Sequence, residues 1–193
     1  MSQRTSFTII MAAQDEGEAL ARNLPQILTQ EYDGDYSVVV IDESSTDNTA
    51  DVLDALKAEN QRLYTTFVPK YHFQRNPRRL ALSLGVKAAK SDWIVVVEPT
   101  TPITSAQWLQ ELAPFAQEPT VLMTGYINRK SGDVRLRTFD ELSPAKGIIS
   151  KTERWRSTKG GRWKTRLIPG TGYDFIAVRH SLGHELLKFF EIP

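Results

Sequence analysis

Runs of apolar residues alternate with amphipathic stretches along much of the chain. Residues 38–41 and 93–97 are continuous apolar runs in which β-branched side chains predominate, and residues 7–11 form a similar run. Strands buried on both faces of a parallel sheet have this pattern, whereas half-exposed strands alternate between polar and apolar residues. Each run is followed by a stretch with apolar residues at helical spacing. The alternation predicts an α/β fold with an open, mostly parallel sheet flanked by helices.

The same spacing predicts where the elements lie. Pro25 falls inside the first helical stretch, which predicts a kink or a late helix start. Residues 71–79 are polar and basic and are expected to form a loop. Trp93 and Trp108 are expected in the core. We expect strands at 7–11, 38–41, 62–68, 93–97 and 121–128, and helices at 18–29, 49–60, 79–90, 105–115 and 184–192.

A cluster of polar residues follows the central strand, at 42–49. Residues of these types bond their own backbone and favour turns and helix N-caps, and Asn48 or Thr49 is the expected cap of the next helix. Ligands of open α/β sheets bind at the carboxyl ends of the strands, where Asp42 and Glu43 would lie. The two acids are therefore either binding residues or turn-forming residues that only cap the helix.

Composition narrows the class of protein without identifying a partner. The 193 residues carry a net charge of +1, with 40% hydrophobic and 24% charged residues, as in ordinary globular proteins. The sequence has no cysteine, which excludes disulfides and thiolate metal sites and suits a reducing compartment. No apolar run approaches the roughly 18 residues of a spanning helix, and no signal peptide precedes the first strand. We therefore expect a cytoplasmic protein without a transmembrane segment, with peripheral attachment at the inner membrane face as an alternative.

Three blocks of the sequence resemble glycosyltransferase family 2. Residues 7–16, Phe-Thr-Ile-Ile-Met-Ala-Ala-Gln-Asp-Glu, resemble the opening strand of the family and its Pro-x-x-Asn-Glu turn. Residues 39–49 resemble its Val-Val-Asp-Asp-Gly-Ser-Thr-Asp-Asn-Thr segment, and residues 80–108 resemble its Leu-Ala-Leu-x-Leu-Gly-Ile-Lys-Ala-Ala helix and the strand and motifs that follow. The resemblance implies the GT-A fold, with a Rossmann-like nucleotide-binding half. It also implies one domain, with a nucleotide-sugar-binding core at 1–130 and a shortened acceptor-side segment with a basic loop at 131–193.

The resemblance further implies that the protein binds a nucleotide-diphospho-sugar donor. Asp42 would accept a hydrogen bond from an N–H of the base, because a carboxylate only accepts. Glu16 would contact the ribose, although an acid at this position also suits the N-terminus of a helix. Arg78 and Arg79 would bind the diphosphate, or would belong to a solvated basic loop together with Arg75. The donor-binding residues implied in this way are Ala13, Glu16, Asp42, Glu43, Arg78, Arg79, Glu98 and Thr100.

The metal motif of the family is altered in this chain. Family members hold Mn²⁺ or Mg²⁺ with Asp-x-Asp, and the matching residues here are Glu98, Pro99 and Thr100. Two carboxylates suit a hard divalent cation, whereas Thr100 offers only a neutral hydroxyl. Glu98 is thus the metal ligand that the resemblance implies, and we expect a divalent cation to bind weakly.

The last third of the chain contains a basic segment at 146–166, with eight basic residues and one acid. Trp155 and Trp163 lie among the basic residues. Such a segment suits a diphosphate, an anionic membrane surface or a solvated loop over the binding site, and no nucleic-acid-binding motif accompanies it. Residues 168–180 resemble the Gly-x-Gly-x-Asn-x-Ala-x-Arg segment beside the acceptor site of the family, with Asp174 near its Asn.

Two functions are compatible with the sequence. One is the transfer of a sugar from a nucleotide donor to a hydroxyl of a glycan or lipid-linked acceptor, with Asp174 or Glu98 as catalytic residue. Asp140 and Glu141 are further candidates for the base. The other function is that of a catalytically inactive relative, which binds nucleotide or acts as a regulatory or interaction module.

Overall fold

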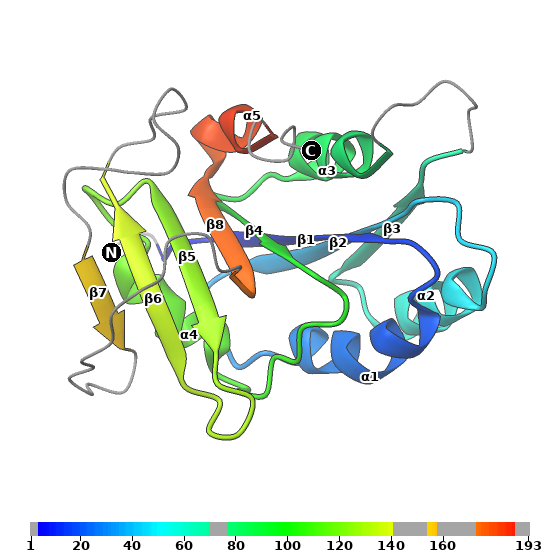
Figure 1. The fold of residues 1–193 in the computed structure, drawn as a ribbon, viewed down its shortest axis with the longest axis horizontal. Coiled ribbons are helices and arrows are strands. Elements are labelled where there is room, and N and C mark those ends of the chain that lie inside the picture. The colour runs from blue at the N-terminus through cyan, green and yellow to red at the C-terminus, as the bar shows by residue number, and fades with distance from the viewer. Residues whose placement is uncertain (1–3, 70–76, 141–153, 158–172, 188–193) are drawn as a thin grey trace.

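The described residues of the computed structural model, 4–69, 77–140, 154–157 and 173–187, form one mixed sheet with helices on both faces (Figure 1). Their eight strands lie in the order β3-β2-β1-β4-β8-β5-β6-β7. The strands are β1 (Phe7–Ala13), β2 (Tyr36–Asp42), β3 (Leu63–Phe67), β4 (Trp93–Val97), β5 (Leu122–Ile127), β6 (Val134–Phe139), β7 (Arg154–Ser157) and β8 (Phe175–Arg179). The helices are α1 (Gly17–Leu28), α2 (Thr49–Glu59), α3 (Pro77–Ala88), α4 (Trp108–Leu112) and α5 (Gly183–Leu186), with the 3₁₀ turns η1 (Ala113–Phe115) and η3 (His180–Leu182).

The first half of the chain forms the parallel part of the sheet. β1 pairs in parallel with β2 on one side and with β4 on the other, and β3 extends the sheet beyond β2. Every residue of β1 and β4 is buried, as continuous apolar runs predict. Alternate residues enter two cores, since Ile9 and Val38 pack on one face of the sheet and Ile10 and Val39 on the other. The predicted α/β fold, an open sheet flanked by helices, is confirmed.

The rest of the sheet is antiparallel and extends it beyond β4. β8 lies between β4 and β5 and is antiparallel to both, and β6 and β7 follow as antiparallel neighbours. β6 alternates between its two faces, because Val134 and Leu136 are buried whereas Arg135 and Arg137 are half-buried. The strand predicted at 121–128 is β5, whereas the apolar runs do not predict β6, β7 or β8. Because these strands pair in antiparallel fashion, the sheet is mixed rather than mostly parallel as expected.

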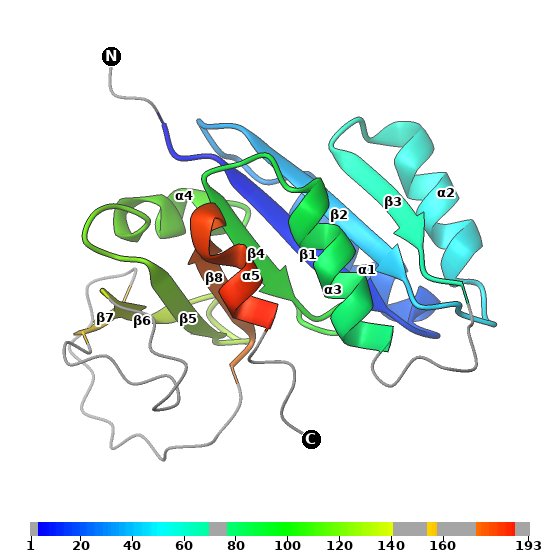
Figure 2. The same ribbon diagram turned by 90° about the horizontal axis from the view of Figure 1, so that it is seen from above.

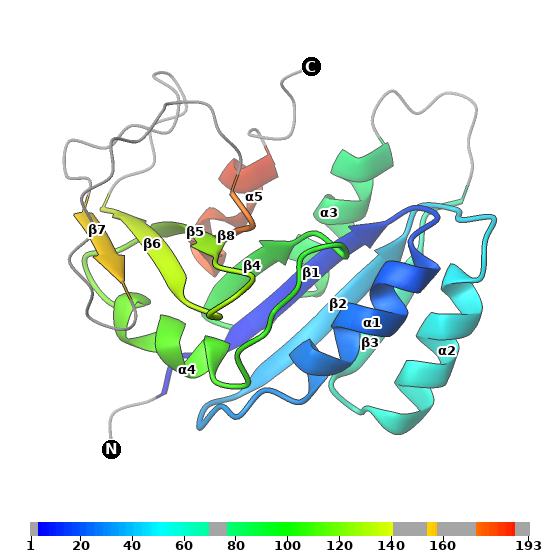
Figure 3. The same cartoon turned by 60° about the horizontal axis from the view of Figure 1, so that its bottom comes forward.

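The helices divide between the two faces of the sheet. α1, α2 and α4 lie on one face and α3 and α5 on the other (Figures 2 and 3). Trp108 of α4 is fully buried, and its ring meets the ring of Phe175 edge-on with 5.3 Å between the centroids. Trp93 is also buried, so both tryptophans belong to the core as expected.

The start of α1 agrees with the prediction and that of α3 differs from it. α1 begins at Gly17, within one residue of the helix predicted at 18–29, and continues through Pro25, so the late start is not observed. α3 begins at Pro77, and proline suits the first helical position because its φ is fixed near the helical value. Arg78 therefore lies in the first turn of a helix rather than in a loop.

The two shorter helices also differ from the predicted ranges. α4 begins at Trp108, three residues later than expected, and η1 completes the segment. Of the helix predicted at 184–192, the described residues show α5 as far as Leu186, and residues 188–193 lie outside them. The described part of the chain contains no helix that is long and apolar enough to cross a membrane.

α3 approaches the sheet closely at Gly85. A Cβ atom at this position would lie 2.4 Å from Cγ2 of Ile10 in β1 and 3.1 Å from Cδ1 of Ile41 in β2. The helix backbone can therefore rest directly on these side chains only because residue 85 has none. Arg78 lies two turns nearer the helix N-terminus on the same face, so this contact also sets how closely Arg78 approaches the strand ends.

Candidate functional site

Three strands of the parallel half end at the same edge of the sheet, and an acid follows each of them. Glu16 follows β1, Glu43 follows β2 and Glu98 follows β4. Glu43 is buried, whereas Glu16 and Glu98 are half-buried. Open α/β sheets bind their ligands at this carboxyl edge. We refer to Glu16, Glu43 and Glu98 together with Arg78 as the Arg78 cluster.

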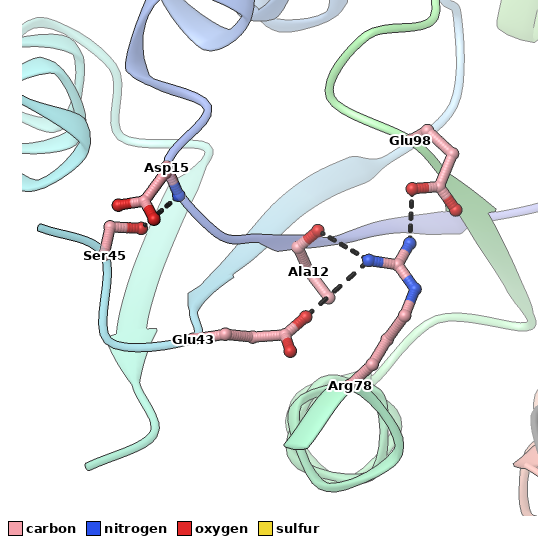
Figure 4. Close-up of polar contacts among 6 residues, drawn as sticks. All are labelled: Ala12, Asp15, Glu43, Ser45, Arg78 and Glu98. Carbon is pink, nitrogen blue, oxygen red and sulfur yellow. Dashed lines mark hydrogen bonds and ion pairs between the residues drawn. The ribbon is translucent and has the colours of Figure 1, made fainter. Parts of the chain in front are cut away.

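Arg78 reaches from the first turn of α3 into the middle of these acids (Figure 4). Its Nη2 donates to Oε2 of Glu98 in an ion pair, and its Nη1 lies 3.6 Å from Oε1 of Glu43. Nη1 also donates to the carbonyl oxygen of Ala12 in β1, 3.3 Å away. The side chain of Arg78 is 35% exposed and that of Glu98 is 45% exposed, whereas that of Glu43 is only 4% exposed. One guanidinium thus connects the ends of three strands and still faces solvent.

Two acids of the Arg78 cluster, Glu16 and Glu43, have raised pKa values. Burial raises the pKa of Glu43, and the positive charge of Arg78 opposes that shift. Burial also raises the pKa of Glu16, and the negative charge of Glu98 raises it further. Three carboxyl groups share one cation, so the cluster has a surplus of negative charge when all of them are ionised. Perturbed acids at a strand-end site are typical of functional sites.

The turns after β1 and β2 are joined by hydrogen bonds centred on Asp15. Oδ1 of Asp15 accepts from the backbone N–H of Thr46, 2.6 Å away, and from that of Asp47, 3.3 Å away. The N–H of Asp15 donates to Oγ of Ser45 over 2.8 Å (Figure 4). The bond from the N–H of Thr46 is the main reason that the pKa of Asp15 is lowered. Asp15 and Ser44 have φ values of 53° and 62°, so both turns contain a left-handed residue that is not glycine.

Asp47 serves the N-termini of two helices. Its Oδ2 accepts from the N–H of Gly17 in α1 and its Oδ1 accepts from the N–H of Thr49 in α2, and each donor–acceptor distance is 3.0 Å. The hydroxyl of Thr49 also donates to Asp47 and is the main cause of its lowered pKa. Asn48 is the N-cap residue of α2, as expected, but its side chain makes no capping bond, and Asp47 accepts from the first N–H of the helix instead. We call the group that joins the two turns the turn network: Asp15, Ser45, Thr46, Asp47 and Thr49.

Asp42 lies at the carboxyl end of β2 and is half-buried. Its Oδ1 accepts from the N–H of Ser45 over 2.9 Å, which accounts for a turn-forming role and uses one of its two carboxylate oxygens. Its carbonyl oxygen accepts from the N–H of Val68 over 2.8 Å. Ala13, its partner in the β1–β2 ladder, is fully buried and offers a ligand no side-chain surface.

The altered metal motif forms a tight turn after β4. The N–H of Thr101 donates to the carbonyl oxygen of Glu98 over 2.9 Å. Asn23 of α1 is buried, and its Nδ2 donates to the carbonyl oxygen of Pro99 over 2.8 Å. Pro99 is buried and Thr100 is exposed. The turn thus leaves Glu98 directed into the Arg78 cluster and Thr100 on the surface.

The residues of this turn do not suit a divalent cation. Glu98 is already paired with Arg78, and Thr100 offers only a neutral hydroxyl. Across the described ranges, no group of three or more His, Cys, Asp or Glu side chains is arranged to hold a metal ion. A hard divalent cation requires several charged oxygen ligands. Weak cation binding at this turn stays a prediction.

Tyr173, which the sequence analysis does not select, lies close enough to Glu98 and Tyr126 to be affected by their charges. Burial is the main cause of the raised pKa of Tyr173, and the charges of Glu98 and Tyr126 raise it further. Tyr173 lies two residues before the start of β8 and is 38% exposed, and Tyr126 belongs to β5. The sequence offered one indication of a role for Tyr173, because this residue lies in the segment 168–180 that resembles the acceptor side of the family.

Asp174 lies at the same edge, where β8 begins. Val97 at the end of β4 pairs with Phe175 at the start of the antiparallel strand β8. Glu98, which follows β4, therefore lies opposite Asp174, which precedes β8. Oδ2 of Asp174 accepts from the N–H of Ile127 over 2.6 Å. The side chain of Asp174 therefore takes part in the junction of β5 and β8.

The other predicted residues fall elsewhere. Asp140 follows β6, whose last residue Phe139 pairs with Leu122 at the start of β5, so Asp140 lies at the opposite edge of the sheet and cannot act at this site. Arg79 is exposed on α3. Arg75 and Glu141 lie outside the described residues, as does the basic segment 146–166 except for β7, which pairs with β6.

Comparison with known proteins agrees with this geometry. The model of the family described as Glycosyl transferase family 2 matches residues 8–187. The chain belongs to glycosyltransferase family 2. No curated protein sequence matches this family member significantly.

Two solved glycosyltransferase structures share the fold of this family 2 member. The mannosyltransferase PcManGT from Pyrobaculum calidifontis, in complex with GDP-Man and Mn²⁺, aligns with a TM-score of 0.54 and 23% identity over 66% of this chain and 37% of its own. TarS from S. aureus aligns with a TM-score of 0.50 and 21% identity over 61% of this chain and 34% of its own. TarS structures with UDP and with UDP-GlcNAc align equally well. These likenesses show the GT-A fold, and the alignments cover 37% of the PcManGT chain and 34% of a TarS chain that comprises residues 1–349.

Proposed function

We propose that the protein transfers a sugar from a nucleotide-diphospho-sugar to a hydroxyl group of an acceptor. The arrangement of the carboxyl edge carries this proposal: Asp42 ends β2, and Arg78 contacts the ends of β1 and β4 beside it. A carboxylate that can accept from a base and a cation that can meet a diphosphate therefore lie on neighbouring strand ends. PcManGT in complex with GDP-Man and TarS with UDP-GlcNAc support a nucleotide sugar as the donor here.

We assign donor binding to residues 1–130. Asp42 accepts from an N–H of the base, and Glu16 contacts the ribose. Arg78 and Arg79, in the first turn of α3, meet the diphosphate. Glu43 acts on the donor through Arg78, because its buried carboxylate holds the guanidinium in place.

The acceptor, a glycan or lipid-linked hydroxyl compound in this proposal, approaches from the antiparallel half. Its oxygen attacks the anomeric carbon while the bond from that carbon to the β-phosphate oxygen breaks. The acceptor proton passes to a carboxylate, for which Asp174 and Glu98 are the candidates at this edge. The nucleoside diphosphate leaves with additional negative charge, which Arg78 stabilises.

Calorimetric titration with UDP and GDP tests the donor site. Asp42→Asn should weaken binding about tenfold or more, because a hydrogen bond to a charged group contributes roughly 1.5–3 kcal/mol and the amide can present an N–H to the base. Asp51→Asn is the matched control, since it removes the same charge from an exposed position in the first turn of α2. Unchanged affinity in a correctly folded Asp42→Asn variant would reduce Asp42 to a turn residue.

Release of nucleotide from a nucleotide sugar, with and without acceptor glycans, tests the transfer. Glu98→Gln and Asp174→Asn should each lower kcat by about 100-fold if they accept the proton, since general base catalysis contributes at least that much. The residue whose replacement leaves kcat unchanged is not the base. If the protein binds nucleotide tightly but never cleaves a nucleotide sugar, with or without acceptor, the inactive binding module is favoured instead.

A further inference from the structure

We infer that the guanidinium of Arg78 takes the place of the divalent cation implied by the family motif, so that this protein binds a nucleoside diphosphate without a metal. The identity of the ligand rests on the proposed function. The replacement of the metal by Arg78 rests only on contacts within the protein. This replacement and the identity of the ligand can therefore be tested separately.

The guanidinium of Arg78 lies among three oxygen atoms, from Ala12, Glu43 and Glu98 (Figure 4). It is paired with a carboxylate oxygen of Glu98, lies 3.6 Å from one of Glu43 and bonds the carbonyl oxygen of Ala12 over 3.3 Å. Carboxylate and carbonyl oxygens are the ligands that hard divalent cations bind. Here all three converge on the charge of an arginine, and a second cation at this point would be repelled at short range.

The charges around Arg78 explain why it is held there. The side chain of Glu43 is 4% exposed, and a buried carboxylate needs a positive partner or a proton. Arg78 supplies this partner at any physiological pH, because the guanidinium does not deprotonate. Thr100 contributes no charge where the family motif has a second carboxylate, so the attraction for a metal ion is weaker while the resident positive charge remains.

Arg78 also retains the means to bind a diphosphate. A guanidinium carries five N–H donors, and the contacts with Ala12, Glu43 and Glu98 engage at most three of them. The side chain is 35% exposed, so phosphate oxygens can approach it from solvent. Arginine binds phosphate through paired N–H groups, which gives both charge and orientation.

Manganese binding by the nucleotide-free protein tests the position of the cation. Titration followed by electron paramagnetic resonance should show at least about tenfold tighter Mn²⁺ binding for Arg78→Met than for the wild type, because the carboxylates of Glu43 and Glu98 lose their partner. Lys87→Met is the matched control, since it removes the same charge from an exposed position of α3 and should cause no gain. Adding Glu98→Gln to Arg78→Met should abolish the gain. Arg78→Gln gives the same test if Arg78→Met does not fold.

Nucleotide titration in EDTA tests the ligand. The wild type should bind UDP or GDP at least about tenfold more tightly than uridine or guanosine, and Mn²⁺ should change this by less than about twofold. The preference for the diphosphate should disappear in Arg78→Met and return in part in Arg78→Lys, which restores the charge without the paired donors.

The outcomes separate the inference from the proposed function. The inference is overturned if the wild type binds Mn²⁺ as tightly as Arg78→Met, if neither binds it, or if the diphosphates bind only with Mn²⁺ present. In the last case donor binding, and with it the proposed function, still stands. A wild type that binds neither nucleosides nor diphosphates overturns the proposed function and the ligand assignment, whereas a gain of Mn²⁺ affinity in Arg78→Met supports the cation position independently.

Discussion

The Arg78 cluster and the turn network lie at the same edge of the sheet, yet the pKa shifts of Glu16 and Glu43 in the first are opposite in direction to those of Asp15 and Asp47 in the second. In the turn network, Asp15 and Asp47 accept hydrogen bonds from backbone N–H groups and a threonine hydroxyl, and these bonds lower their pKa values. In the Arg78 cluster, burial raises the pKa values of Glu16 and Glu43, and one guanidinium is shared among the acids. Acids bonded to the backbone hold the two turns together. Acids that share one exposed cation can exchange part of that contact for a ligand.

Gly17→Ala should disrupt the turn network and have the largest effect on stability. A Cβ atom at residue 17 would lie 2.2 Å from Oδ1 of Asn48 and 2.9 Å from the backbone nitrogen of Thr49, so the starts of α1 and α2 would have to separate. We expect the free energy of unfolding to fall by roughly 1–3 kcal/mol, as for other overpacked sites, in urea denaturation. Glu18→Ala, at the exposed next position, should stay within about 0.5 kcal/mol of the wild type. A Gly17→Ala variant as stable as the wild type would show that the turns are not tightly joined.

The opposite pKa shifts predict opposite pH dependences of stability. The pKa of Asp15 is lowered, so its contribution is present above its ordinary pKa of 3.8 and is lost as the pH falls through the folded-state value. The pKa of Glu43 is raised, so its contribution is present below its ordinary pKa of 4.5 and is lost as the pH rises through the folded-state value. The stability difference between the wild type and Asp15→Asn should therefore shrink towards acid pH. The difference between the wild type and Glu43→Gln should shrink towards neutral pH.

Denaturant unfolding at a series of pH values measures both differences. Each variant removes one ionisable group and keeps a side chain of similar size, so the two profiles can be compared directly. Profiles that slope in the same direction would contradict the contrast between the two groups of acids.

The smallest effect is expected for nucleotide binding by Asp15→Asn. The carboxylate of Asp15 is engaged by Thr46 and Asp47, and an asparagine oxygen can accept the same bonds. The affinity for UDP or GDP should therefore remain within about twofold of the wild type in calorimetry. A loss as large as that expected for Asp42→Asn would place Asp15 among the binding residues and remove the distinction between the two groups.

The parallel half of the fold can be predicted from sequence, whereas in the antiparallel half only the strand β5 can. β1 and β4 are continuous apolar runs because helices cover both of their faces, and this pattern is visible locally. The position of β8 between β4 and β5 depends on the pairing of Val97 with Phe175, 78 positions apart (175 − 97). Local periodicity carries no information about such a pairing. The apolar residues of β6 are interrupted by Arg135 and Arg137, so no continuous apolar run marks this strand.

The site shows the same division. Asp42, Glu43 and Glu98 are recognisable because acids that follow buried strands are expected at the carboxyl edge. The connection of Glu43 and Glu98 through Arg78 is not recognisable, because it depends on where α3 begins and how deeply it packs. The role of Asp47 is equally hidden, since its bond to the N–H of Gly17 joins two turns that are far apart in the chain.

The contact at Gly85 has a consequence for how the charges are arranged. α3 rests on Ile10 at this glycine, and Arg78 lies two turns away, roughly 10 Å along the helix axis. A methyl group at residue 85 would act as a spacer that tilts the helix and draws the guanidinium away from Glu98. The distance between the charges of Arg78 and Glu98 therefore depends on Gly85, a residue that carries no charge and no side chain. Two chains with identical charged residues can therefore differ in how those charges interact, because one helix packs closer to the sheet in one chain than in the other.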